Sequence, residues 1–483
     1  MKTTSIIILL LISQFCYCAD YIVLGGKKYT KQILTDRTAL VDGIYKYSYS
    51  LPEYPLRVFI VEIDLTNPDI KMETCLSSDT LYGKRATVLE MSRNKTANGH
   101  QVVAAINTDF FQFTDNKCAN GMMVDGQIGQ IPTIFGPIIG FEEVDNIPYL
   151  DIMRFNPDNS KVYPGIGSQK LSGINVQLEE GQTDRLILYN SLFGSYTKTN
   201  TSPIVSEAVL TLKDGETWGA NKKVNCMVKK VYPNKGNTHI GPDEFVLSGF
   251  GTTYSKFISN LKEGNPIKIE VAITLENNAG ISPILRQMSG SNTLALKNGD
   301  IPVITSTAGD PHANNPRSSA AYSADKKKLF LCVVDGRSSL SKGVTVPLLG
   351  EILKDLGASD GINFDGGGSS MLVAGNQIFN SPSEQRAVSQ GLLAVYKGND
   401  VSLSKIDKDR NILSVDKGTG ELIIDADILQ LGVKQILCFD LLGNRIGTWS
   451  ANDPILLPKG TGNIYLIQLL LQSNTIRVEK VIL

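Results

Sequence analysis

The sequence is poor in the residue types that build metal and redox sites. It contains three histidines, His100, His239 and His312, which lie far apart in the chain, so a site made of several histidines is not expected. It contains no Cys-x-x-Cys spacing. It also has no excess of either charge, because Lys and Arg number 47 and Asp and Glu number 48. This balance gives no indication of nucleic acid or of a membrane surface as a partner.

The N-terminal apolar run is too short to span a bilayer. It covers residues 6–12, whereas a transmembrane helix needs roughly 20 apolar residues. Lys2 precedes this run and small residues surround Cys18, which together predict a secretory signal peptide at residues 1–18. Lipidation at Cys16 or Cys18 would need an aliphatic and small-residue pattern that the preceding residues lack. We therefore expect export to the periplasm, the cell surface or the extracellular space, with no transmembrane segment in the mature chain.

Five cysteines remain after that cleavage, and an odd number cannot all pair. They are Cys75, Cys118, Cys226, Cys332 and Cys438. Cys332 and Cys438 lie in apolar, strand-like runs, which predicts buried free thiols. A disulfide between Cys75 and Cys118 is left open, because nothing in the sequence argues for it.

A glycine-rich stretch follows the best helical pattern in the chain. Residues 346–356 have apolar positions at helical spacing, and Gly357 falls where a C-cap glycine is expected. Residues 362–364 then predict a short buried strand, with 371–373 as its partner. Between the two lie Asp365, Gly366, Gly367, Gly368, Ser369 and Ser370.

Three consecutive glycines are costly to order, so they need a physical reason. One reason is a tight hairpin turn. The other is close approach of the backbone to a ligand, with N–H groups facing an anion or a sugar hydroxyl. The stretch is not a Walker loop, because no Gly-Lys-Ser/Thr follows. Asp365 at the strand end favours the ligand.

Polar residues follow three predicted buried strands. Asn107 and Asp109 follow the apolar run at 102–106, Asp335 and Arg337 follow 328–334, and Asp365 follows 362–364. We expect these strands to lie in one sheet and their polar ends to form a crevice where ligands bind. The alternative for Asn107 and Asp109 is a capped turn at a strand end.

Three arginines near these strand ends are candidates for binding phosphate. Arg317, Arg337 and Arg386 each carry a planar guanidinium, which can bind phosphate through two parallel hydrogen bonds. Each one, taken alone, could equally form a structural ion pair. The predicted strands between about 150 and 285 show no such chemistry, and we expect them to extend the sheet.

Five motifs together resemble the phosphodiester glycosidase family. In chain order they are Asn-Thr-Asp-Phe-Phe at 107–111, Pro-Arg-Ser at 316–318, Val-Asp-Gly-Arg at 334–337, Asn-Phe-Asp-Gly-Gly-Gly-Ser-Ser at 363–370 and Asn-Ser-Pro-Ser at 380–383. The resemblance covers residues from about 102 to 396. The chain departs from the family pattern at Thr108 and Asp109, where Gly is usual, and at Asn315 and Ser318. Asp109 adds a carboxylate that the pattern does not require.

The resemblance implies a hydrolase that cleaves a sugar-1-phosphodiester at the anomeric carbon. Such a reaction needs donors for the phosphate and a carboxylate near an oxocarbenium-like transition state. We expect Asp365 to supply the carboxylate, with Asp335 and Asp109 as further candidates. The expected substrate-binding residues are Asn107, Arg317, Arg337, Gly366, Gly367, Gly368, Ser369, Ser370 and Arg386. No cofactor is expected, although the clustered aspartates leave a structural Ca²⁺ open.

The predicted fold is α+β. A β-rich catalytic domain with a mixed sheet and few helices is followed by a small all-β, sandwich-like domain, as the 44 glycines and 17 tyrosines favour a β-rich, turn-rich chain. The predicted divisions are an N-terminal β-rich part of the catalytic region at 19–100, the phosphodiester glycosidase domain at 101–398 and the C-terminal domain at 400–483. The C-terminal ending resembles a type IX secretion sorting domain, which implies secretion machinery as a partner.

Two other functions remain open at this stage. The same scaffold could be a catalytically silent protein that binds a phosphate-linked glycan at the cell surface, or a phosphodiesterase that cleaves the P–O bond instead. An enzyme should bring Arg317, Arg337 and Asp365 together in one open pocket.

Overall fold

The computed structural model describes residues 20–398 with short gaps, and part of the C-terminal segment. The gaps are residues 131–135, 143–145, 179–181, 200–203, 277–284, 305–306 and 308. Beyond residue 412 the described segments are 413–415, 421–424, 433–440, 445–450, 455, 464–471 and 476–482. The predicted signal peptide at 1–18 lies outside the described residues. The chain divides into two compact units, Met1–Lys397 and Gly398–Leu483.

Two antiparallel sheets of the first unit pack face to face and hold the candidate residues. The first runs in the order β22 (Thr293–Leu296), β25 (Asp360–Asn363), β23 (Arg317–Tyr322), β24 (Lys328–Val334), β5 (Leu56–Asp64), β4 (Ile44–Leu51) and β3 (Gln32–Val41). The second runs in the order β27 (Gln377–Ile378), β26 (Leu372–Ala374), β7 (Gln101–Asn107), β28 (Gln390–Tyr396) and β6 (Ile70–Leu76). Val61 and Leu331 line the core between them from the first sheet. Ile106 and Leu392 line it from the second, and burial of each such side chain contributes roughly 1.5–3 kcal/mol.

A helix covers the outer face of each of these sheets. α1 (Val88–Lys95) packs on the five-stranded sheet and α3 (Val346–Asp355) packs on the seven-stranded sheet. A capping box begins α1, because the Thr87 side chain accepts from the backbone of Glu90 and the Glu90 carboxylate accepts from the backbone of Thr87. Gly357 follows α3 with a φ of 89°, as predicted for a C-cap glycine. The strands between the two helices are therefore covered on both sides.

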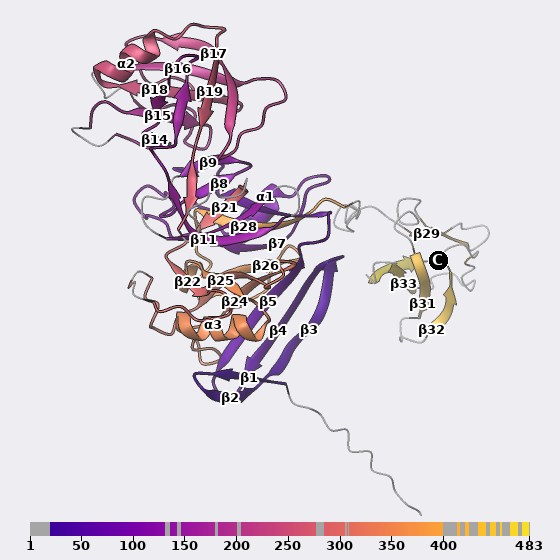
Figure 1. Ribbon diagram of the computed structural model, residues 1–483. Coiled ribbons are helices and arrows are strands. Elements are labelled where there is room, and N and C mark those ends of the chain that lie inside the picture. Colours follow the sequence, from indigo (N-terminus) through magenta and orange to yellow (C-terminus); the bar gives the residue numbers. More distant parts are fainter. Residues whose placement is uncertain are drawn as a thin grey trace, which may run out of the picture. The chain divides into compact units, whose positions relative to one another are not determined.

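Two further sheets and one helix occupy the other end of the first unit (Figure 1). One runs in the order β20 (Ile273–Leu275), β11 (Pro148–Phe155), β10 (Pro137–Glu142), β21 (Leu285–Gly290), β8 (Met122–Val124) and β9 (Gln127–Gln130). The other runs in the order β13 (Gln169–Lys170), β12 (Lys161–Tyr163), β19 (Pro266–Glu270), β17 (Lys223–Tyr232), β16 (Val205–Leu212), β18 (Glu244–Phe250), β15 (Leu186–Asn190) and β14 (Gly173–Ile174), with α2 (Gly251–Ser259) packed against it. Trp218 and Phe245 stack in their shared core at a centroid distance of 4.5 Å. The prediction that this stretch only extends the main sheet was wrong, because it builds its own sheets around its own core.

The predicted α+β, β-rich fold is confirmed. The described residues contain three α-helices and many strands, and the parallel pairing of β14 with β15 makes the eight-stranded sheet a mixed one. The Asp-Gly hairpin is also present, since β8 pairs with β9 and both Asp125 and Gly126 have positive φ. A short two-stranded sheet, β1 (Tyr21–Leu24) and β2 (Lys27–Thr30), begins the described chain.

Two predicted strand arrangements were wrong. The strands ending near Asn107, Val334 and Asn363 do not share a sheet, because β7 belongs to the five-stranded sheet and β24 and β25 to the seven-stranded one. Likewise β26 does not form a hairpin with β25 but pairs with β7 and β27. An apolar run specifies a buried strand, but it carries no information on which of two facing sheets the strand joins.

The second unit contains a four-stranded antiparallel sheet and a hairpin among its described residues. The sheet runs in the order β32 (Arg445–Trp449), β31 (Val433–Phe439), β33 (Ile464–Leu471) and β34 (Ile476–Ile482), and the hairpin joins β29 (Leu413–Val415) to β30 (Leu422–Ile424). Leu413 and Leu422 of the hairpin share one core with Ile436 and Ile467 of the sheet. Its sandwich-like arrangement and its role in sorting stay predictions.

All five cysteines in the described part of the chain are free and buried. The predicted burial of Cys332 and Cys438 is confirmed, and the Cys75–Cys118 disulfide that the sequence left open is absent. Burial raises the pKa of the Cys332 thiol to about 12.

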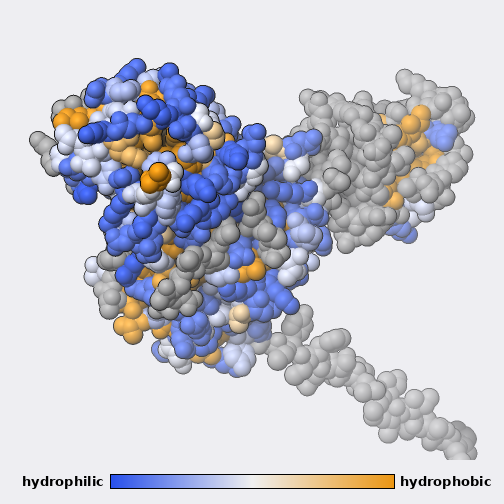
Figure 2. Space-filling view, turned by 45° about the horizontal axis from the view of Figure 1, so that its top comes forward, coloured by the Kyte–Doolittle hydropathy of each residue, from blue (hydrophilic) through white to orange (hydrophobic). Residues whose placement is uncertain are grey.

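No helix of the described chain has the length and apolar character needed to cross a membrane. The face in Figure 2 is mostly hydrophilic where residues are described, with apolar residues in small separate groups.

The division into units predicts that the first unit folds without the second. The last strand of the first unit, β28, ends before the boundary, and the next backbone N–H, of Lys397, donates to Asp69 O at 2.6 Å. A chain that ends after Lys397 should therefore show the far-UV circular dichroism spectrum of a folded β-sheet protein. Its melting temperature should equal that of the main transition of the full chain. A melting temperature lower by more than a few degrees would show that the two units depend on each other.

Candidate active site

The Asn107 side chain joins the two facing sheets at their polar ends. Its Nδ2 donates to Asp365 O at 2.7 Å, and its Oδ1 accepts from Ser318 Oγ at 2.7 Å and from Met371 N at 3.1 Å. The Asp365 N–H in turn donates to Thr108 O at 2.8 Å. Asn107 is fully buried, so these contacts place it beneath the candidate site as a support. Its predicted role as a direct substrate ligand stays a prediction.

The three glycines form a tight turn, and a side chain at each position would clash with a different neighbouring group. The turn η1 covers Gly367–Ser369. A Cβ on Gly366 would lie 2.6 Å from Pro316 O, which is closer than backbone packing allows. Gly367 has a φ of 62°, in the left-handed region that favours glycine. Of the two reasons weighed for the glycines, the hairpin is excluded, because the strands on either side belong to different sheets.

Two of the glycines also lie directly beneath guanidinium groups. A Cβ on Gly367 would lie 2.8 Å from Arg337 Nη2, and one on Gly368 would lie 2.6 Å from Arg386 Nη2. Both guanidinium groups can therefore lie close to the backbone, because glycine has no side chain that would clash with them. The turn brings two positive charges together at the ends of the sheets.

Asp365 lies at the start of this turn and is largely buried. Burial raises the pKa of its carboxyl to about 6, while the Ser369 hydroxyl and the Arg386 and Arg317 guanidinium groups act in the opposite direction. A carboxyl with such a pKa is mostly ionised at neutral pH and can gain or lose a proton at a pH close to neutral. This is the range in which acid–base groups of enzymes work best.

Asp109 is a second carboxyl close to Asp365. Its oxygens accept from Asn120 N at 2.6 Å and from Asn120 Nδ2 at 2.7 Å, which fixes its orientation. Burial, with a smaller contribution from the negative charge of Asp365, raises the pKa of Asp109 to about 7, although the hydrogen bonds from Asn120 act in the opposite direction. The two carboxyls thus influence each other, as in sites where one acts ionised and the other protonated. The sequence-predicted pair is brought together.

Asp335 has a different environment. Its Oδ1 accepts from Asn380 Nδ2 at 2.9 Å, and its Oδ2 accepts from Ser381 N at 3.1 Å. Its own backbone carbonyl accepts from Ser341 Oγ at 2.6 Å. Burial raises the pKa of Asp335 to about 6. These contacts anchor the segment at 380–381 beside the glycine turn, so Asp335 supports the site through that loop.

Arg317 is committed to the protein backbone. Its Nε donates to Val344 O at 3.0 Å, its Nη1 to Gly309 O at 3.1 Å, and its Nη2 to Asp310 O at 2.7 Å and Ala313 O at 2.8 Å. Four of its five N–H groups are thus used, and the residue is 1% exposed. A substrate phosphate would find no free pair of donors here. The geometry makes Arg317 a support for the loop at 309–313, and a direct phosphate contact stays a prediction.

Arg337 presents the opposite case. It is exposed, its backbone is in the left-handed region with a φ of 60°, and Nη2 donates to Asn315 Oδ1 at 3.2 Å. It forms no ion pair among the residues that the structure describes. Its remaining donors therefore face solvent above the glycine turn, where an anion could reach them.

Arg386 pairs with Glu384 beside Gly368. Its Nη2 lies 2.7 Å from Glu384 Oε2, and its charge lowers the pKa of that carboxyl. The guanidinium is also 6.0 Å from the centre of the Phe113 ring. Both Arg337 and Arg386 thus lie at the open side of the site, whereas Arg317 lies inside it.

Several buried polar atoms near these strand ends have no hydrogen-bond partner among the described residues. They are Thr293 Oγ1, Asn363 Oδ1, Ser370 Oγ and Gln390 Nε2. Gln390 contacts Thr108, and Thr293 and Asn363 are paired across β22 and β25. Because buried polar atoms are nearly always paired, their concentration around Asp365 indicates a place built for a polar ligand or ordered water.

Sequence reasoning missed several supporting residues. Asn120 and Glu384 hold or pair with the predicted residues, and no local pattern marks them. Asn380 lay within a quoted motif, but its contact with Asp335 was not predicted. Ser318 lay within a quoted motif, and its contact with Asn107 follows from the facing of two sheets, which the sequence does not reveal. Phe113, which lies beside Arg386, follows the quoted Phe110-Phe111 pair by two positions and was not singled out.

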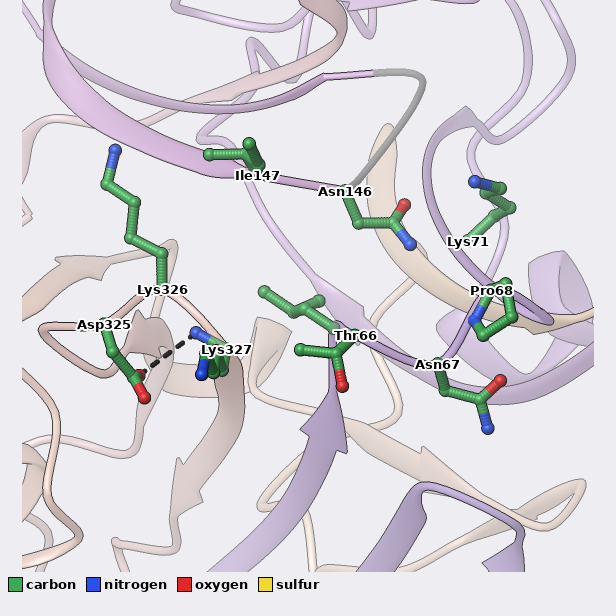
Figure 3. Close-up of a pocket in the computed structure, with 10 residues that line it drawn as sticks. Thr66, Asn67, Pro68, Lys71, Asn146, Ile147, Asp325, Lys326 and Lys327 are labelled. Carbon is green, nitrogen blue, oxygen red and sulfur yellow. Dashed lines mark hydrogen bonds between the residues drawn. The ribbon is translucent and has the colours of Figure 1, made fainter.

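A pocket of about 410 Å³ lies elsewhere in the first unit (Figure 3). It is lined by Leu65, Thr66, Asn67, Pro68, Lys71, Asn146, Ile147, Asp325, Lys326 and Lys327. These residues lie where β5 ends and just before β24 begins, whereas the candidate site lies at the opposite end of β24. Figure 3 shows the Lys326 and Lys71 side chains on opposite sides of the pocket. It is separate from the glycine turn.

A known protein family is similar to the part of the chain that carries the glycine turn and the three arginines. Residues 221–395 match the model of the phosphodiester glycosidase family. The expected family resemblance is confirmed over that range. The matched range includes the Asp365 turn and all three arginines. The match supports hydrolysis of phosphodiester-linked sugars as the class of activity. No curated protein sequence matches the chain.

Solved structures show the same fold at low identity. A hypothetical protein from Synechocystis is similar over 76% of this chain and 68% of its own, with 17% identity and a TM-score of 0.53. A protein described as exported, from Burkholderia pseudomallei, is similar over 70% of this chain and 74% of its own, with 17% identity and a TM-score of 0.51. The catalytic domain of zebrafish N-acetylglucosamine-1-phosphodiester alpha-N-acetylglucosaminidase, auto-inhibited by its pro-peptide, aligns over 75% of this chain and 80% of its own, with 13% identity and a TM-score of 0.36. The first two share the fold, and the third is too distant to carry an argument.

The contrast between the two arginines is testable by one substitution at each. Arg317→Lys removes buried donors from several carbonyls, so it should lower the free energy of unfolding by about 3 kcal/mol. Arg337→Lys changes an exposed side chain and should leave the free energy of unfolding within about 0.5 kcal/mol of wild type. Urea unfolding of both variants measures the difference. Equal stability of the two variants would contradict a supporting role for Arg317.

Proposed function

We propose that the protein is an exported hydrolase that cleaves a sugar-1-phosphodiester at the glycosidic C–O bond, releasing the sugar and a phosphomonoester. The observation that carries this proposal is the Asp365 carboxyl on a glycine turn that supports Arg337 and Arg386. A carboxylate next to the exposed Arg337 and the partly buried Arg386 suits a substrate with a reactive sugar carbon next to a phosphate. The family match over residues 221–395 supports the same substrate class.

The phosphate is bound on the side of Arg337 and Arg386. The Arg337 guanidinium can donate parallel hydrogen bonds to two phosphate oxygens. Nε and Nη2 of Arg386 already donate to Glu384, so Arg386 would offer its Nη1 group. Ser370, whose buried hydroxyl has no partner in the described chain, offers a further donor close by, whereas Gly367 N already donates to Pro316 O at 2.9 Å. These donors favour the reaction most where negative charge grows, which is on the departing phosphate oxygen.

The sugar lies with its anomeric carbon toward Asp365. As the bond between that carbon and the bridging oxygen breaks, its electron pair stays on the phosphate oxygen and positive charge develops on the sugar. The ionised Asp365 stabilises that positive charge, and water adds its oxygen to the anomeric carbon and loses a proton. Asp109, with a pKa of about 7 and a fixed orientation, is placed to exchange that proton.

Export and sorting belong to the same proposal. The predicted signal peptide at 1–18 would direct export, and the second unit would engage secretion machinery. The substrate is then a phosphate-linked glycan outside the cytoplasm. Hydrolysis in water labelled with heavy oxygen tests the bond that breaks, because C–O cleavage places the label in the sugar and P–O cleavage places it in the phosphate.

Asp365→Asn should lower turnover of a sugar-1-phosphodiester by at least ~10²-fold, because it removes the charge that stabilises the transition state. The full chain is assayed with product identification by mass spectrometry. A catalytically silent glycan-binding protein would show no turnover in the wild type either. A fully active variant would remove Asp365 from the mechanism.

The stability of the same variant provides its control. The folded state raises the pKa of Asp365 from 3.8 to about 6, so the stability that it contributes is present below pH 3.8 and is lost as the pH rises through about 6. Asn carries no such penalty. The variant should therefore melt at the wild-type temperature or above it at about pH 7.5, and the difference should shrink at about pH 4. A loss of stability at neutral pH would mean that the low turnover reflects damage to the fold.

Arg337→Lys should separate phosphate binding from sugar chemistry. Lys keeps the charge but loses the planar pair of donors, so kcat/KM on a phosphodiester substrate should fall about tenfold or more. A matched sugar with a neutral nitrophenyl leaving group should lose much less. Equal losses on the two substrates would contradict a contact between Arg337 and the phosphate.

A further inference from the structure

Phe113 is a large aromatic side chain at the tip of a closed loop beside the candidate site. It is 67% exposed. The loop is closed by Gln112 N, which donates to Lys117 O at 2.9 Å, and by Asn116 N, which donates to Gln112 O at 3.0 Å. At its base Phe111 forms an isolated bridge with Cys118. An exposed ring on an ordered loop is unusual enough to need a reason, because exposing it forfeits the free energy of burying it.

The loop is fixed to the body of the first unit on both sides. Asn116 Nδ2 donates to Gly83 O at 3.1 Å, and Ser389 Oγ donates to Asn116 O at 2.5 Å. Ser389 directly precedes β28 of the five-stranded sheet. The ring of Phe113 is therefore held in a defined place rather than on a free tip.

Two guanidinium groups flank this ring. Arg85 lies 5.0 Å from the ring centres of both Phe111 and Phe113, which are themselves 5.0 Å apart. Arg386 lies 6.0 Å from the centre of Phe113. Over the part of the chain that the structure describes, Arg85 has no carboxylate within ion-pair distance, so its charge is not neutralised by the protein. Glu384 pairs with Arg386, so Arg85 supplies the unpaired positive charge beside the flat Phe113 ring.

This surface continues directly into the candidate active site. Arg386 lies over Gly368 of the turn that begins at Asp365, and the same guanidinium is 6.0 Å from the Phe113 ring, so Arg386 connects the ring to the glycine turn. A ligand that reaches from Asp365 over Arg386 would next meet Phe113 and then Arg85.

We propose that Phe113 and Arg85 form an outer subsite that binds a further sugar unit of an anionic, phosphate-linked glycan. The apolar face of a sugar ring packs on Phe113, and Arg85 binds the phosphate of that next repeat through its open donors. The inference rests on the proposed function, since it assigns the substrate class of the same site. It makes the substrate a chain of at least two repeats rather than a single sugar-1-phosphodiester.

Two synthetic glycans test the subsite, one with a single sugar-1-phosphate repeat and one with two. In the full chain, Phe113→Ala and Arg85→Gln should each raise KM for the two-repeat glycan about tenfold more than for the single-repeat glycan. Phe113→Tyr keeps the ring and should restore the wild-type value. The Arg85→Gln variant should bind an uncharged oligosaccharide as tightly as the wild type does.

Matched controls come from the same chain. Tyr21 is a 48% exposed aromatic with Lys28 above its ring at 3.3 Å, and it lies in the separate β1–β2 sheet. Lys84 is an exposed cation next to Arg85 in the sequence. Tyr21→Ala and Lys84→Gln should leave KM for both glycans unchanged, and melting temperatures of all variants should match the wild type.

Calorimetric binding to Asp365→Asn separates this inference from the proposed function. If the wild type hydrolyses neither glycan but the two-repeat glycan binds and Phe113→Ala weakens that binding tenfold, the subsite stands and the proposed reaction fails. If both glycans are hydrolysed and Phe113→Ala affects them equally, the reaction stands and the subsite is overturned. Loss of binding in Tyr21→Ala would also overturn the subsite, because the effect would not depend on this surface.

Discussion

The site depends on the hydrogen bonds of one buried amide. Asn107 ends a strand of the five-stranded sheet, yet its side chain bonds to Ser318 of the seven-stranded sheet and to the backbone of Asp365. Two sheets that pack through apolar side chains can slide on each other at small cost, whereas a directional hydrogen bond fixes their relative position. Asn107 therefore sets where the Asp365 backbone sits relative to Asp109, which lies two residues after the end of β7.

The arginines divide into an inner and an outer set with opposite physical roles. The buried Arg317 guanidinium donates its hydrogen bonds to backbone carbonyls instead of water, and these bonds hold the loop at 309–313 in place. Arg337 and Arg386 keep part of their donors open to solvent and rest on glycines. A buried, fully paired cation is a poor ligand for an incoming anion, because binding would first break existing hydrogen bonds. The charge of Arg317 still acts on Asp365, so it contributes to the electrostatics of the site without touching a ligand.

The sequence located the site better than it described the fold around it. Three adjacent glycines after Asp365 pointed to a special backbone, and the structure shows one, because each glycine meets a neighbour that a side chain would displace. The apolar runs predicted the strands β7, β24 and β25, but their pairing depends on contacts between distant segments, and two predicted pairings were wrong. Arg317 and Arg337 look alike in sequence, since burial is a property of the assembled sheets. Phe113 was not predicted, because the sequence does not show which of the three neighbouring phenylalanines, Phe110, Phe111 and Phe113, stays exposed.

The unpaired, buried thiols have a consequence for how the chain can be made. None of the five cysteines in the described residues bonds to another, and burial raises the pKa of Cys75 and Cys226 to about 12. Thiols in that state are poor nucleophiles and are shielded from oxidants. Once folded, the protein needs neither a disulfide-forming enzyme nor a reducing environment to hold its shape. If the chain is exported as we propose, its thiols would be exposed to an oxidising compartment until the sheets close over them, and rapid folding would protect them from cross-linking.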